Sequence, residues 1–179
     1  MKHLKEFTIP FVGLKDGKHH FDFEIDKTFF DSFDYDEFNS SDMLVDLTLE
    51  KKATLMELHF NIKGTVNINC DLTNEPYNQI IKNDFDLVVK FGESYNDENE
   101  ELLILPHGEY ELHLEQYCYE LIVLAVPTKR IHPGVKDGTL DSDILKKLEE
   151  LSPKSKEIKE DNEEIDPRWN TLKKLLTDK

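Results

Sequence analysis

The sequence predicts an α+β fold built around a mainly antiparallel sheet. Apolar and polar residues alternate through most of 43–70 and again through 20–25, as in strands that bury one face. Residues 115–126 are apolar on nearly all sides, and 137–151 carry apolar residues at helical spacing. We therefore expect a curled sheet or a partly closed barrel, with one buried helix, one amphipathic helix, and an acidic tether that ends in a short C-terminal helix.

The first elements are expected to be two strands joined by a turn. Residues 7–12 are predicted as a short strand, 15–18 as the turn, and 20–25 as the returning strand. The segment 26–40 is predicted as a short helix or an ordered loop that covers one end of the sheet with its aromatic side chains. These aromatic residues are Phe29, Phe30, Phe33, Tyr35 and Phe38.

The strongest strand pattern lies in residues 43–70. A hairpin connection is expected at Lys51-Lys52-Ala53. Gly64 is expected to mark a bulge or a sharp bend in a long strand that curls. Residues 85–91 supply a further strand.

The second half of the domain is predicted to be more helical. An acidic loop over 93–101 precedes a short strand at 102–105. Residues 115–126, which end at Pro127, are predicted as a buried helix because twelve residues is long for a strand; a central strand is the alternative. Residues 137–151 are predicted as an amphipathic helix that packs back on the domain.

The chain has room for one domain and a tail. We expect one β-rich domain over residues 1–151, a disordered acidic tether over 152–165, and a short helical motif over 166–179. Residues 149–166 hold eight carboxylates and three lysines with few aliphatic residues, so they bury too little to order themselves.

The last segment combines helix-start signals with an apolar stripe. Asp166 suits the N-cap and Pro167 the first helical position. Because so short a helix is marginal by itself, its apolar side needs a surface on its own domain or on a partner. The stripe consists of Leu172, Leu175 and Leu176, with Trp169 beside it.

The charge balance argues against a surface built mainly to bind phosphates. The chain has 22 Lys and Arg residues against 38 Asp and Glu, a formal net charge of −16. Basic partners fit this charge better. Two short basic islands stand out, one formed by Lys129, Arg130, His132 and Lys136, and one by Arg168, Lys173, Lys174 and Lys179.

The charge runs have two interpretations. They are either solvated faces and loops, the usual case, or contact surfaces in which an acidic face holds a basic protein while the basic islands touch RNA. No apolar leader segment or membrane-length apolar run is present, which predicts a cytoplasmic protein without a membrane partner. Cys70 and Cys118 are expected to be free thiols.

The sequence shows no catalytic constellation. Its seven histidines are dispersed, and it has no glycine-rich phosphate loop, zinc-protease motif or nucleophile elbow. We expect a non-enzymatic protein with no cofactor and no small-molecule substrate.

Two motifs resemble one protein family. They are Asp166-Pro167-Arg168-Trp169 with Leu172 and Leu175, and the apolar segment 120–127 that ends in Pro127. Together with the order of the elements from Met43 onward, they are similar to the YceD family, also called DUF177, the large ribosomal RNA subunit accumulation proteins.

The chain departs from the family at a cysteine motif. Many members carry Cys-x-Arg-Cys-Leu-x-Pro, whereas residues 70–76 here keep Cys70 and Pro76 but have Leu72 and Thr73 at the arginine and second cysteine. A structural zinc needs four ligands, commonly from paired cysteine corners, so we expect no metal. Cys70 is expected to be a small apolar residue at a strand end, and Cys118 a core residue of the helix.

The resemblance implies a non-catalytic ribosome-biogenesis factor that promotes 23S rRNA processing or accumulation and large-subunit assembly. The acidic charge favours binding to a basic ribosomal protein or a pre-50S particle over free RNA. The alternatives are direct binding of 23S rRNA precursor, with Trp169 stacking on a base, and a general acidic adaptor unrelated to ribosomes. The residues expected to bind a partner or RNA are Lys129, Arg130, His132, Asp166, Pro167, Arg168, Trp169, Leu172 and Lys173.

Overall fold

The computed structural model describes residues 4–140 and 143–152. The chain divides into two compact units, Met1–Ser142 and Asp143–Lys179, and each is described by itself. The predicted boundaries after residues 151 and 165 stay predictions. Most of the predicted tether and the whole predicted C-terminal helix lie outside the described residues.

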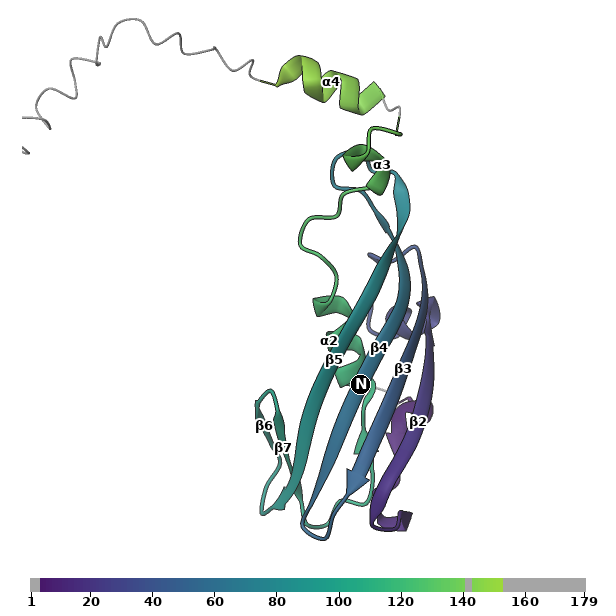
Figure 1. The fold of residues 1–179 in the computed structure, drawn as a ribbon. Helices are drawn as coiled ribbons and strands as arrows, with labels where there is room; N and C mark the ends of the chain where they lie inside the picture. The colour runs from purple at the N-terminus through teal and green to yellow at the C-terminus, as the bar shows by residue number, and fades with distance from the viewer. Residues whose placement is uncertain (1–3, 141–142, 153–179) are drawn as a thin grey trace, which may run out of the picture. The chain divides into compact units, whose positions relative to one another are not determined.

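The first unit is organised by a six-stranded sheet with the order β2-β3-β4-β5-β7-β6 (Figure 1). All neighbours are antiparallel except β5 and β7, which confirms the α+β class and the mainly antiparallel sheet. Because β2 and β6 lie at opposite edges and do not pair, the sheet is open and the partly closed barrel is wrong. The strands are β2 (Gly17–Asp26), β3 (Ser40–Lys51), β4 (Leu55–Asn69), β5 (Pro76–Gly92), β6 (Asn96–Asn99) and β7 (Leu102–Pro106).

The central hairpin follows the alternation of the sequence. The backbone N–H of Lys52 donates to the carbonyl of Leu55 at 2.9 Å, so the predicted connection is confirmed. The buried face of β3 and β4 takes every second residue, which sets the register because a slip by one residue would expose the whole set. Fully or almost fully buried are Met43, Val45, Leu47, Leu49, Met56, Leu58, Phe60, Ile62, Val66 and Ile68.

Gly64 is required for close packing between strands, and the predicted bulge is wrong. The pairing of β4 runs without a shift through Gly64, which lies between Met43 and Ile81. A Cβ atom at Gly64 would lie 2.2 Å from the carbonyl oxygen of Asp42 and 2.7 Å from the Cα of Met43. With φ at +155°, the position also has a backbone conformation that favours glycine.

The predicted strand over 7–12 is mostly wrong. Only β1 (Thr8–Ile9) is extended, between the 3₁₀ turns η1 (Lys5–Phe7) and η2 (Phe11–Gly13), and it pairs with β8 (Leu112–His113). Pro10 has no N–H to continue a ladder. The alternating apolar residues Phe7, Ile9 and Phe11 are nevertheless buried in the core, which explains why the pattern resembles a strand.

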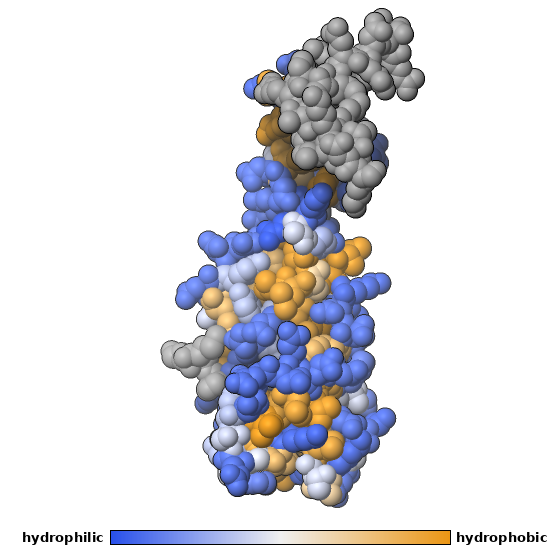
Figure 2. All heavy atoms as spheres, turned by 90° about the vertical axis from the view of Figure 1, so that its left-hand side faces the viewer, coloured by the Kyte–Doolittle hydropathy of each residue, from blue (hydrophilic) through white to orange (hydrophobic). Residues whose placement is uncertain are grey.

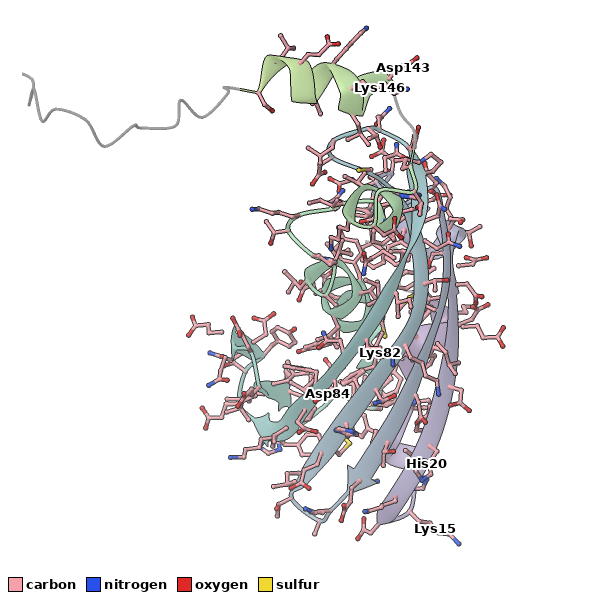
Figure 3. All side chains as sticks on the ribbon, turned by 45° about the horizontal axis from the view of Figure 1, so that its top comes forward. Lys15, His20, Lys82, Asp84, Asp143 and Lys146 are labelled. Atoms are coloured by element: carbon pink, nitrogen blue, oxygen red, sulfur yellow. The ribbon has the colours of Figure 1, made fainter. Side chains whose placement is uncertain are left out.

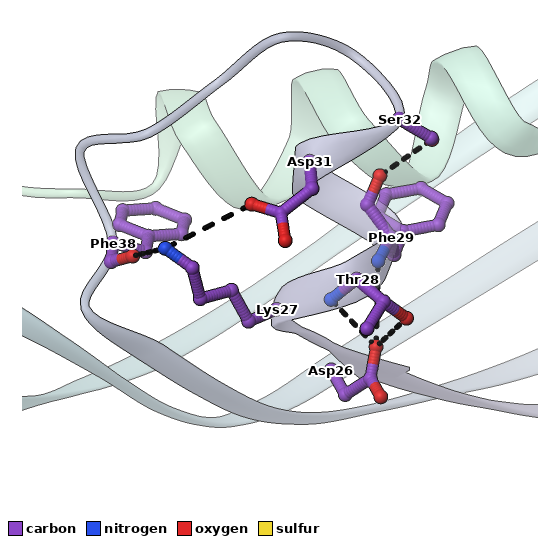
Figure 4. Close-up of polar contacts among 7 residues, drawn as sticks. All are labelled: Asp26, Lys27, Thr28, Phe29, Asp31, Ser32 and Phe38. Atoms are coloured by element: carbon purple, nitrogen blue, oxygen red, sulfur yellow. Dashed lines mark hydrogen bonds and ion pairs between the residues drawn. The ribbon is translucent and has the colours of Figure 1, made fainter.

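Residues 26–40 form a short helix followed by an ordered loop. Asp26 caps α1 (Lys27–Asp31) by accepting the N–H of Thr28 at 2.9 Å and of Phe29 at 3.3 Å (Figure 4). The hydroxyl of Thr28 also donates to Asp26, which is the largest cause of the lowered pKa of this carboxyl. The aromatic residues of this segment cluster with one another and with α2 (Glu115–Leu124): Phe33 stacks on Tyr119 with ring centroids 4.5 Å apart.

The segment before Pro127 is the helix α2, so the strand alternative is wrong. Cys118 and Ile122 are fully buried, whereas Leu124 is 80% exposed, so the helix buries one side and not all of its apolar surface. The Nδ2 of Asn83 on β5 donates to the carbonyl of Leu121 at 3.0 Å and ties the helix to that strand. The prediction that residues 93–101 form a loop is wrong in part, because these residues contain the strand β6.

Within the described residues, two helices follow α2. In the first unit, α3 (Pro133–Lys136) is followed by a turn in which Gly138 has φ +73° and Asp137 accepts from Thr139. The predicted helix over 137–151 is therefore shorter and is α4 (Asp143–Leu151). This helix belongs to the second unit, and its packing on the domain stays a prediction. Among the described residues, no helix is long and apolar enough to cross a membrane.

Candidate interaction surfaces

The loop after α2 is tied to the turn between β4 and β5. The backbone N–H of Arg130 donates to the Oδ2 of Asp71 at 2.8 Å, and the carbonyl of Arg130 accepts the N–H of Asp71 at 2.7 Å. This reciprocal pair holds Lys129, Arg130 and His132 of the predicted basic island at one end of the sheet.

The side chain of Arg130 is engaged within the protein. Its Nη2 forms an ion pair with the Oε2 of Glu37, which also accepts the hydroxyl of Tyr35 at 3.3 Å. The hydrogen bond to Glu37 raises the pKa of Arg130, and burial raises the pKa of Tyr35 to about 12. The guanidinium therefore has a structural role whether or not it also binds a partner.

His132 is likewise held by its neighbours. Its Nδ1 accepts the N–H of Gly134 at 2.9 Å and caps α3, and its ring lies edge-on to Tyr77 with centroids 5.5 Å apart. Lys129 differs: it is exposed, and no hydrogen bond or ion pair joins it to another described residue. Of the three predicted residues on this loop, Lys129 is the one whose charge is available to a partner.

Cys70 lies at the end of β4 and is buried, as predicted, but its sulfur has polar partners. The backbone N–H of His132 donates to the Sγ of Cys70 at 3.3 Å. Burial opposes ionisation of this thiol, yet hydrogen bonds from His132, Thr73 and Leu72 lower its pKa. Thr73 thus supplies a hydrogen bond at this corner.

The other cysteine is a core residue. Cys118 is fully buried, and burial raises the pKa of its thiol. Both cysteines are free. Over the described ranges 4–140 and 143–152, no group of three or more His, Cys, Asp or Glu residues is placed to hold a metal ion.

The exposed face of strands β2 to β5 is acidic. It presents nine carboxylates against four lysines, because the residues between the buried positions point outward. The carboxylates are Asp22, Glu24, Asp26, Asp42, Asp46, Glu50, Glu57, Asp84 and Asp86; the lysines are Lys18, Lys63, Lys82 and Lys90.

One row across this face brings three carboxylates into register. Asp22 pairs directly with Asp46, Asp46 with Asn61, and Asn61 with Asp84. Like charges directly opposite on neighbouring strands destabilise a sheet, so the pair of Asp22 and Asp46 carries a cost in free energy, while Asp84 extends the row beyond Asn61. The next outward-facing residue along β5, Asp86, differs because its Oδ1 lies 2.6 Å from the Nδ1 of His59.

The carboxylate row could not be read from the sequence. Alternation predicts that each aspartate points outward, but the row depends on the register of three strand pairs.

The remaining predicted site residues lie outside the described residues. They are Asp166, Pro167, Arg168, Trp169, Leu172 and Lys173.

Comparison with family models yields one match. The model described as "Large ribosomal RNA subunit accumulation protein YceD" matches residues 58–176. The chain belongs to the YceD family. The match begins within β4 and includes β5 to β7, the loop with Lys129 and Arg130, and the Asp-Pro-Arg-Trp motif, so the suspected family is confirmed. No curated protein and no solved structure matches the chain.

Proposed function

We propose that this YceD protein is a non-catalytic, cytoplasmic factor that promotes accumulation of 23S rRNA by holding a basic protein of the large subunit on the acidic face of its sheet. The family description places its members in the accumulation of large-subunit rRNA. The carboxylate row Asp22, Asp46 and Asp84 supports this binding mode. A bound cationic segment would reduce the repulsion between these carboxylates.

Direct RNA binding through the loop after α2 has less support. Arg130 and His132 already have partners within the protein, which leaves Lys129 as the available cation there. With a net charge of −16, a phosphate backbone would meet a repulsive field over most of the surface. We therefore propose protein binding as the main function and direct RNA binding as the second candidate.

A deletion strain tests the function. Loss of the gene is expected to lower the ratio of 23S to 16S rRNA or to leave unprocessed 23S ends. Complementation with Asp22→Asn, Asp46→Asn and Asp84→Asn combined is expected to fail, although the protein remains folded because the changes remove repulsion.

The matched control neutralises three other exposed carboxylates, with Glu98→Gln, Glu100→Gln and Glu101→Gln combined. It changes the net charge equally and is expected to complement. Unchanged rRNA in the deletion strain would contradict the function; full complementation by the sheet variant would contradict the acidic face as the binding surface.

A further inference from the structure

Along most of one edge of β5, no strand within the described residues pairs with it. On one side, β4 pairs with β5 from Pro76 to Lys90, almost its whole length. On the other side, β7 pairs only with Val88–Gly92. The described residues therefore provide no strand beside residues 76–87 on that edge.

The backbone groups at this edge can be assigned from the pairing. The N–H of Val88 donates toward β7, to the carbonyl of Glu101 at 2.9 Å. Because peptide groups alternate sides along a strand, the N–H and C=O groups of Ile80, Lys82, Asp84 and Asp86 point to the same edge. Within the described residues, the hydrogen bond found at these groups is from the Nε2 of Gln79 to the carbonyl of Ile80.

The surroundings of this edge are apolar on one side and charged on the other. On the helix side, Leu124, at the end of the helix tied to β5 through Asn83, is 80% exposed; on the charged face, Ile80 is 65% exposed beside Lys82. Figure 2 looks from this side and shows apolar areas separated by a hydrophilic band. Asp84 and Lys82 lie along β5 on the exposed face (Figure 3), and Asp84 ends the carboxylate row.

We propose that the β5 edge, residues 78–87, binds an extended segment of a basic protein as an added strand. The inference rests on the proposed function and adds the mode of binding. Main-chain hydrogen bonds to Lys82, Asp84 and Asp86 would align the segment, as in other strand-addition complexes. Lysine or arginine at every second residue would face Asp84 and Asp86, and the apolar residues between them would face the helix side near Leu124.

A second copy of this chain fits the edge poorly in the register that would pair opposite charges. The antiparallel register that sets Lys82 opposite Asp84 of another copy also sets Pro76 of that copy opposite Lys90. That place is already taken by β7, since Lys90 pairs with Ile104. Exposed charges such as Lys82 and Asp84 also discourage edge-to-edge pairing between like chains. A short segment from another protein avoids this clash.

The test uses a synthetic peptide of alternating lysine and valine, with an alternating glutamate and valine peptide as control. The full chain is titrated with each, and amide hydrogen exchange is followed residue by residue. We expect the lysine peptide alone to bind and to slow exchange at Lys82, Asp84 and Asp86, because their N–H groups become donors in a new ladder.

A matched pair of variants separates the backbone from the side chain. Lys82→Ala and Lys82→Pro both remove the ammonium, but only the proline removes the edge N–H, which takes no part in pairing with β4. We expect Kd for the lysine peptide to be about 3- to 10-fold higher for Lys82→Pro than for Lys82→Ala, from the loss of one hydrogen bond. The melting temperature of both variants is measured together with Kd, to show that each variant is folded.

Three results would overturn the inference. Peptide binding without slower exchange at the three amides would show that charge on the sheet face acts alone, and would leave the proposed function standing. No binding of the lysine peptide would reject the edge as a site for basic segments. Concentration-dependent dimers that disappear in Lys82→Pro would assign the edge to a second copy. The hydrogen-exchange measurement uses the unchanged chain, so it tests strand addition at the β5 edge even if the Lys82→Pro variant fails to fold.

Discussion

Arg130 and Glu37 form an ion pair across 93 residues of sequence. The pair joins the loop after α2 to the aromatic loop after α1, next to the Asp71 contacts that fasten the same loop to the turn between β4 and β5. A residue that the sequence marks as a candidate for RNA binding therefore fastens three separate segments together.

Replacing Arg130 by alanine is expected to destabilise the fold, whereas Lys129→Ala is expected to leave stability unchanged. Arg130 loses a partly buried, charge-assisted hydrogen bond, and Lys129 has no described partner. A double-mutant cycle with Glu37→Gln, measured by urea denaturation, should give a coupling of about 0.2–1 kcal/mol. Zero coupling would show that the ion pair has no role in stability.

The raised pKa of Tyr35 predicts a loss of stability in alkaline solution. Burial keeps the phenol neutral, with a pKa of about 12 in the folded chain against about 10 in the unfolded chain. This contribution is complete below pH 10 and is lost as the pH rises from about 10 to 12. Stability measured over that range should fall less steeply in Tyr35→Phe. Equal slopes would contradict the assignment.

Gly64→Ala is expected to destabilise the protein by roughly 1–3 kcal/mol or more, because the added methyl group meets backbone atoms of β3 that cannot move without disturbing the sheet. Gly13→Ala is the control, since its Cβ would meet nothing within 4 Å. The comparison is made by thermal and urea unfolding. A variant at Gly64 as stable as the control would show that the strands can separate locally at little cost.

The purified protein is expected to contain no stoichiometric zinc, and a chelator should leave its melting temperature unchanged. No second cysteine lies beside Cys70 in the sequence, and the sulfur of Cys70 accepts hydrogen bonds from His132 and Thr73 at that corner. Elemental analysis that finds one zinc per chain would overturn this expectation.

The terminal motif is expected to act on a partner. Trp169→Ala and Arg168→Ala should then reduce co-sedimentation with large-subunit precursors while the melting temperature stays nearly constant, since Trp and Arg often dominate binding energy. Melting and co-sedimentation are measured on the same preparations. A large fall in melting temperature with normal co-sedimentation would show instead that the motif stabilises its own domain.

The sequence by itself determined the elements whose pattern is local. Alternation places the strands that contain Val45, Phe60 and Leu87, and Pro127 ends the helix that contains Cys118. The family could also be recognised from sequence, because its motifs are short and contiguous. These features depend on neighbours within a few residues, where propensity and periodicity act.

The tertiary structure decided everything that depends on register and on the meeting of distant segments. Alternation cannot reveal that Asp22, Asp46 and Asp84 share a row, because sliding one strand by two residues preserves every buried position and changes every cross-strand pair. The alternation of Phe7, Ile9 and Phe11 resembles a strand in the sequence. In the structure all three side chains are buried, although Phe7 and Phe11 belong to short 3₁₀ turns. The open sheet, and the part of the β5 edge that no described strand pairs with, depend on where each strand ends relative to its neighbours. This is a long-range property that no local pattern encodes.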